Sequence, residues 1–84
     1  MILHTINKPA AWAKCSGLVT EQDGLVMLED GVYLALSEIK VGHAIRADVE
    51  ARGLLKRVPE HVQLIDYPDF VRLCIKAEKI CAWF

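Results

Sequence analysis

The sequence lacks the features of membrane and secreted proteins. No apolar run approaches the roughly 18–20 residues that a membrane-spanning helix needs. The amino-terminal residues MILHT lack the basic stretch and long apolar segment of a signal peptide. The three cysteines are odd in number and irregularly spaced, unlike those of a disulfide-stapled secreted domain. We therefore expect a cytoplasmic protein without a membrane span.

Motifs for phosphate, metal and nucleic-acid binding are also missing. There is no glycine-rich turn of the G-x-G-x-x-G or Walker type. His4, His43 and His61 have no Cys or His partner at ligand spacing. The basic residues are scattered, and only Lys56 and Arg57 adjoin. We therefore expect no cofactor, no metal and no direct nucleic-acid contact.

Apolar residues, in contrast, are abundant. They make up 54% of the 84 residues, against roughly 45–50% in a typical soluble protein. A chain of this length is expected to form one domain, 1–84, and to bury only about 60–65% of the surface that its unfolded form exposes. The surplus belongs either in a subunit interface or in a well-packed, sparingly soluble monomer, and we favour the interface.

Short apolar runs alternate with helix-start signals along the chain. The predicted strands are 2–6, 25–28, 41–45, 62–65 and 80–84. The predicted helices are 10–17, 32–36 and 49–52, and a fourth begins at 67. This alternation requires crossover connections, so it predicts an α/β fold with helices on both faces of a mostly parallel five-stranded sheet, a three-layer α/β/α sandwich.

Acidic residues follow several of the predicted strands, where parallel sheets gather their functional groups. Asp30, Asp48 and Asp69 could in pairs bind a metal or act as acid and base. Asp30 and Asp48 are also natural helix N-caps, and Asp69 suits a first helical turn. We favour this structural interpretation for all three. His4 lies within the first strand and is expected to be a hydrogen-bonded core residue.

The three cysteines have different surroundings. Cys74 falls on the apolar face of the last predicted helix and Cys81 in the last predicted strand, which predicts core positions for both. Cys15 falls near the carboxyl end of the first predicted helix or just after it, in a stretch expected to be accessible, and Lys14 beside it favours the thiolate. The helix carboxyl terminus opposes that effect. Cys15 is therefore the one candidate catalytic residue, with a structural role as the alternative.

Four stretches together resemble the DsrH/TusB family of small sulfur-relay subunits. They are ILHTINK (2–8), LEDGVY (28–33), ARGL (51–54) and IDYPDFVRL (65–73), the last accompanied by the terminal AWF (82–84). The resemblance implies the DsrEFH-like α/β/α fold. It further implies one of three homologous subunits of a heterohexamer, a dimer of trimers, that relays persulfide sulfur.

In TusB-like members the relay leads to 2-thiolation of the tRNA wobble uridine, and in DsrH-like members it serves sulfur oxidation. In both, the main sulfur-carrying cysteine lies on a partner subunit, which exchanges sulfur with a downstream carrier protein. The resemblance thus implies a non-catalytic or accessory subunit, with tRNA thiolation preferred. DsrH-like members have a cysteine matching Cys15, which leaves a second persulfide site open, although the chain is shorter than usual between Lys8 and Cys15.

Two other classes remain as alternatives. A stand-alone homo-oligomeric protein-binding domain would account for the same apolar surplus. A phosphoryl-transfer domain using Cys15 or Asp30 is disfavoured, because Cys15 lies well past the first strand without a Gly- and Ser-rich turn.

Overall fold

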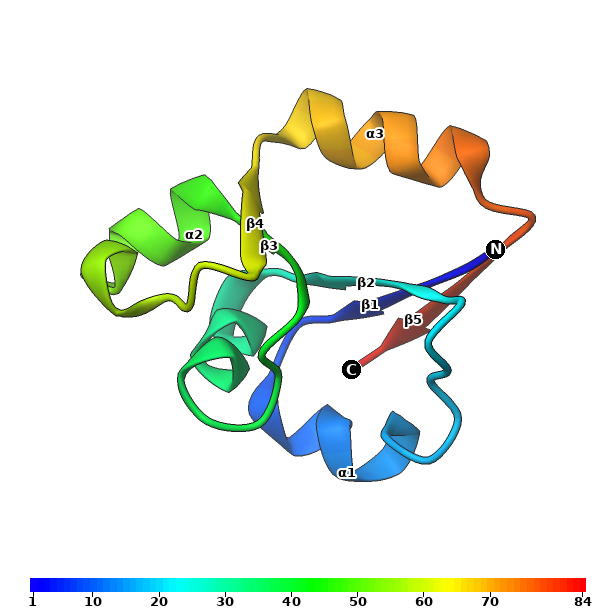
Figure 1. Cartoon of the computed structure of the whole chain (residues 1–84), viewed down its shortest axis with the longest axis horizontal. Coiled ribbons are helices and arrows are strands. Elements are labelled where there is room, and N and C mark those ends of the chain that lie inside the picture. The colour runs from blue at the N-terminus through cyan, green and yellow to red at the C-terminus, as the bar shows by residue number, and fades with distance from the viewer.

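A computed structural model describes all 84 residues, and its centre is one five-stranded sheet in the order β4-β3-β2-β1-β5 (Figure 1). The strands are β1 (Ile2–Ile6), β2 (Gly24–Met27), β3 (Gly42–Ile45), β4 (Val62–Ile65) and β5 (Lys79–Trp83). Every neighbouring pair is parallel. The predicted five-stranded α/β architecture is confirmed.

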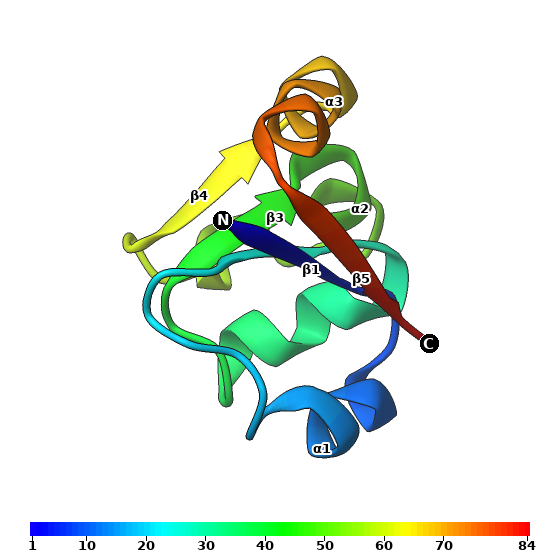
Figure 2. The same ribbon diagram turned by 90° about the vertical axis from the view of Figure 1, so that its right-hand side faces the viewer.

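Helical connections join the strands and cover both faces of the sheet. They are η1 (Pro9–Ala11), α1 (Trp12–Cys15), η2 (Glu29–Leu36), α2 (Arg46–Ala51), η3 (Leu55–Arg57) and α3 (Tyr67–Lys76), where η denotes a 3-10 helix. The first three crossovers step in one direction across the sheet, whereas the crossover from β4 to β5 returns across it. Right-handed crossovers therefore place α3 alone on its face, opposite α1 (Figure 2).

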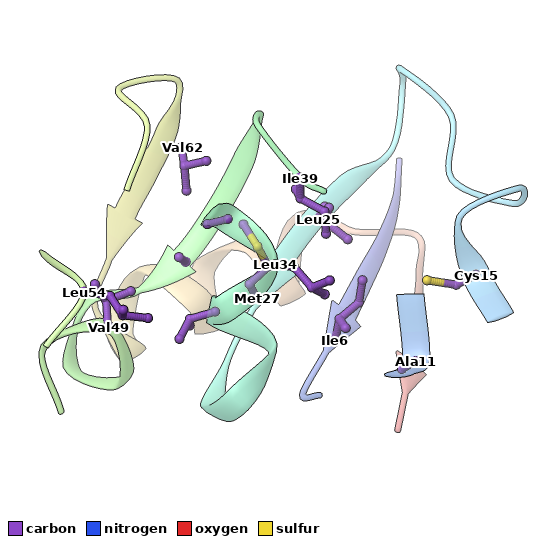
Figure 3. Close-up of a cluster of buried hydrophobic side chains, with 13 residues drawn as sticks. Ile6, Ala11, Cys15, Leu25, Met27, Leu34, Ile39, Val49, Leu54 and Val62 are labelled. Atoms are coloured by element: carbon purple, nitrogen blue, oxygen red, sulfur yellow. The ribbon is translucent and has the colours of Figure 1, made fainter. Parts of the chain in front are cut away.

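Two apolar cores lie on the two faces because successive strand residues point to opposite sides. The larger core joins the sheet to α1, η2 and α2, and includes Ile6 and Met27 (Figure 3). The smaller core lies beneath α3 and includes Leu3 and Val26. This double burial explains why the strands are continuous apolar runs in the sequence.

Two helix starts differ from the predictions. The element predicted at 32–36 is the 3-10 helix η2, which follows Leu28, and Asp30 does not cap it. The helix α2 begins at Arg46, so Asp48 lies in its first turn and is not its N-cap. Instead, the Asp30 carboxylate accepts a hydrogen bond from Arg52 and the Asp48 carboxylate accepts one from the Glu29 amide. These groups lie on other elements, so no local sequence pattern reveals the contacts. The start of α3 is as predicted, with Asp69 in its first turn.

The loop after β2 passes unusually close to the end of β1. The Leu28 amide donates to the Ile6 carbonyl oxygen at 3.0 Å. A Cβ atom on Gly31 would overlap that same carbonyl group. Position 31 therefore requires glycine. Close packing against β1 explains why the LEDGVY segment has a glycine there.

Substitution of Gly31 by alanine should destabilise the fold. Because the new methyl group meets backbone atoms, the loop or β1 must move, at a cost of about 1–3 kcal/mol in the free energy of unfolding. Urea unfolding followed by far-UV circular dichroism measures this cost. Gly17→Ala is the matched control, since no atom lies within 4 Å of its Cβ position, and it should change stability by less than about 0.5 kcal/mol. Equal effects of the two substitutions would contradict the packing argument.

Candidate functional site

Three of the motif segments meet at the carboxyl edge of the sheet. Asp48 Oδ2 accepts hydrogen bonds from the Glu29 amide at 2.7 Å and from the Tyr67 hydroxyl at 3.5 Å. Arg52 donates from Nε to Asp30 Oδ1 at 2.9 Å and from Nη1 to the Asp48 carbonyl oxygen at 3.1 Å. We call these five residues the carboxyl-edge network. It joins η2, α2 and the start of α3.

The network holds a strained backbone conformation. Glu29 has φ 50°, in the left-handed region that a residue with a side chain rarely adopts. Asp48 accepts the amide hydrogen of this residue, and Gly31 anchors the following turn against β1. The exposed side chains of Glu29 and Tyr33 are thereby presented from a fixed loop.

The electrostatics of the network favour a fixed polar surface over acid–base chemistry. The hydrogen bond to Asp30 raises the pKa of Arg52, so the guanidinium keeps its charge. Burial, followed by the charge of Asp48, raises the pKa of Tyr67, which keeps the phenol neutral at neutral pH. No set of three His, Cys, Asp or Glu side chains is placed to hold a metal ion.

The three predicted acidic residues therefore separate. Asp30 and Asp48 join the same network through Arg52. Asp69 remains on α3, where it completes a capping box with Asp66 and bonds to Arg72. The N-cap of α3 is Asp66, which the sequence analysis did not predict. The signal was available, because an acceptor side chain three residues before an acidic one is the spacing of a capping box.

Cys15 does not occupy the accessible position expected for it. Its side chain is fully buried in the larger core. The single turn of α1 places Cys15 four residues after Ala11, on the side facing the sheet (Figure 3), while Lys14 is exposed. Burial raises the pKa of the Cys15 thiol, opposed only in part by a backbone hydrogen bond. Its role in sulfur transfer stays a prediction.

The other two thiols are half-buried, and all three cysteines are free. Cys74 packs against the smaller core, as the predicted apolar face of α3 requires. Cys81 lies on β5, at one edge of the sheet, and is less enclosed than a core residue.

The prediction of a hydrogen-bonded core histidine at position 4 is confirmed. His4 is 3% exposed. The Trp83 indole donates from Nε1 to His4 Nδ1 at 3.1 Å, and the two rings stack. Because an indole N–H only donates, the ring proton of neutral His4 lies on Nε2, which donates to Asp23 Oδ2 at 3.0 Å. Neither partner was predicted, since they are 19 and 79 residues away in sequence.

The architecture defines a class, a small α/β/α domain with an all-parallel sheet. It superposes on the crystal structure of the ychN protein from E. coli with a TM-score of 0.68 and 12% identity, over 96% of both chains. At that identity the likeness concerns the fold alone. No helix is both long and apolar enough to cross a membrane.

Sequence comparisons identify the family within that class. The family model for DsrH-like proteins matches residues 7–80. Protein TusB of Escherichia coli K12 is 36% identical over 97 residues, and Protein TusB of Pectobacterium parmentieri is 35% identical over 95 residues. Both alignments cover 98% of this chain and the whole relative. The chain belongs to the DsrH/TusB family.

Hydrogen bonds to Asp23 predict an acid-dependent loss of stability. The backbone of Thr20, then the side chain of His4, lower the pKa of Asp23 below its ordinary 3.8. The unfolded chain thus binds this proton more readily. The stabilisation is complete above the ordinary pKa and disappears as the pH falls through the lower, folded value.

Asp23→Asn should therefore lose less stability than the wild type as the pH falls below about 4. Urea unfolding between pH 2.5 and pH 6 measures the difference. Glu21→Gln is the control, because this exposed neighbour forms no ion pair, and it should follow the wild-type curve. Identical acid dependence of Asp23→Asn and the wild type would contradict the assignment.

Proposed function

We propose that this chain is an accessory subunit of a persulfide sulfur-relay complex that supports 2-thiolation of the tRNA wobble uridine. Membership of the DsrH/TusB family supports the place in a sulfur relay. The burial of Cys15 is the observation that supports an accessory role. The main sulfur-carrying thiol would then lie on another subunit.

The chemistry of the relay explains why burial matters. A thiolate attacks the outer sulfur of a donor persulfide, the S–S bond breaks, and the donor leaves as a thiolate. The acceptor must therefore be accessible and ionised at neutral pH. Cys15 has the opposite properties, since it is enclosed by the core and its pKa is raised by burial.

Exposed apolar side chains support association with two homologous subunits. Tyr67, Val71 and Ile75 recur every four residues on α3 and therefore share one side of that helix, with Ile75 77% exposed. Phe84 is exposed as well, whereas Trp83 beside it is engaged with His4. We infer that the side of α3 formed by Tyr67, Val71 and Ile75 faces a partner subunit. The loop that presents Glu29 and Tyr33 would add polar contacts to the same interface.

The location and the further partner follow from the same proposal. A relay that serves tRNA modification operates in the cytoplasm and delivers its sulfur to a downstream carrier protein. This chain would contribute contact surface to that assembly and bind no tRNA itself. Residues 1–84 would act as a single module of the complex.

Nucleoside analysis of tRNA in a strain lacking the chain tests this function. We expect 2-thiouridine derivatives to fall to background in that strain and to return with the wild-type chain. Cys15→Ala should restore them equally, because the thiol is a core group, and Cys74→Ala is the matched cysteine control. Co-purification with the two homologous subunits shows whether each variant still assembles.

Two outcomes would contradict the proposal in different ways. Unchanged thiolation without the chain would remove the role in tRNA modification. Loss of thiolation with an assembled Cys15→Ala complex would make Cys15 a sulfur carrier and end the accessory assignment.

A further inference from the structure

A cavity of about 630 Å³ opens at the amino ends of β2 and β3. Its apolar lining comes from Trp12, Val19, Leu25, Ile39 and Val41. Leu25, on β2, and Ile39 both belong to the larger core (Figure 3) and both line this cavity. This size and this mostly apolar wall are typical of a ligand site.

The short first crossover explains why the cavity is there. The helical part of that crossover has only seven residues, Pro9–Ala11 followed by Trp12–Cys15. At a rise of about 1.5–2 Å per residue it spans roughly 10–12 Å, whereas the five residues of β1 span about 16 Å. The helix therefore covers only part of this face, and the loop through Val19 and Asp23 forms the cavity wall.

The carboxylate of Asp23 lines the cavity, and one of its two oxygens accepts no hydrogen bond from the protein. The Asp23 side chain is 10% exposed. Its Oδ2 accepts hydrogen bonds from the Thr20 amide and from His4 Nε2, both at 3.0 Å. Oδ1 has no hydrogen-bond partner in the protein. The same two donors lower the pKa of Asp23, so the carboxylate is ionised at neutral pH. Its Oδ1 is not enclosed by the protein and can accept a hydrogen bond from a cationic ligand in the cavity.

The charges around the cavity have one predominant sign. Glu21 and Glu38 line it together with Asp23, and Lys40 is the only lysine or arginine in the lining. None of Glu21, Glu38 and Lys40 forms an ion pair. Burial lowers the pKa of His43, so this ring is uncharged at neutral pH. The lining therefore carries an excess of negative charge and repels anionic ligands.

We propose that this cavity binds a guanidinium or ammonium group carried on an apolar stem. The cation donates to Asp23 Oδ1, and the stem packs against Leu25 and Ile39. The half-buried indole of Trp12 offers a face on which a guanidinium stacks. Arginine-like ligands are thus favoured, whether free amines or arginine side chains of a protein segment. The inference is independent of the proposed role in sulfur relay.

NMR titration of the full-length ¹⁵N-labelled chain tests the site directly. The probes are agmatine, N-acetylarginine amide and the peptide acetyl-Ala-Arg-Ala-amide, with N-acetylcitrulline amide as the uncharged isostere. We expect saturable shifts of the amides of residues 20–25 and 38–43 and of the Trp12 indole for the cationic probes. The citrulline probe should bind at least about tenfold more weakly.

Two variants locate the charge that binds. Asp23→Asn should weaken agmatine binding at least about tenfold. Glu38→Gln leaves the bonds of His4 intact and should weaken binding about two- to fivefold, which keeps the test valid if Asp23→Asn perturbs the fold. Glu50→Gln, on the exposed side of α2 and outside the cavity lining, is the matched control and should bind like the wild type.

The outcomes are distinct. Stronger binding of the peptide than of agmatine would identify the ligand as an arginine side chain of a protein segment. Stronger binding of agmatine would identify it as a free amine. Either result supports the site. Absence of saturable shifts at the cavity amides, or equal binding of the arginine and citrulline probes, overturns the proposal.

Discussion

The close approach of the loop after β2 to the end of β1 constrains much of this structure. The Leu28 amide bonds to the Ile6 carbonyl oxygen, and only glycine fits at position 31 above that group. Glu29 consequently adopts a left-handed conformation. Asp48 stabilises it by accepting its amide hydrogen, and through this contact α2 and the start of α3 join the same edge. Motif residues far apart in sequence thus act together to hold the loop after β2 at the carboxyl edge of the sheet.

The second constraint is the small size of the chain. Only 20 of its 84 residues are buried, although more than half are apolar. The helix α3 is alone on its face of the sheet and has no buried residue. Exposed apolar side chains therefore remain on α3 and at Phe84. The proposed place in a larger assembly accounts for them, because partner subunits would remove this surface from water.

Local sequence patterns predicted the fold well, since the alternation of strands and helices depends on periodicity and turn chemistry. They failed where distant contacts decide. Asp30 and Asp48 looked like caps, but Arg52 and the Glu29 amide, far along the chain, bind their carboxylates. Cys15 looked accessible because its neighbours are polar, yet one turn of helix directs it into the core. No local pattern predicts Asp23 and Trp83 as the partners of His4, because they lie 19 and 79 residues away in the sequence. The cavity, too, appears only once the short first crossover is placed on the sheet.

The central claim is that the chain supports a sulfur relay without carrying the sulfur on Cys15. Peptide mass spectrometry of the intact complex, incubated with a persulfide donor and then blocked with an alkylating agent, tests it most directly. We predict that a cysteine of a homologous subunit gains one sulfur atom while Cys15 gains none. Gain of a sulfur atom on Cys15, abolished by Cys15→Ala, would contradict the account.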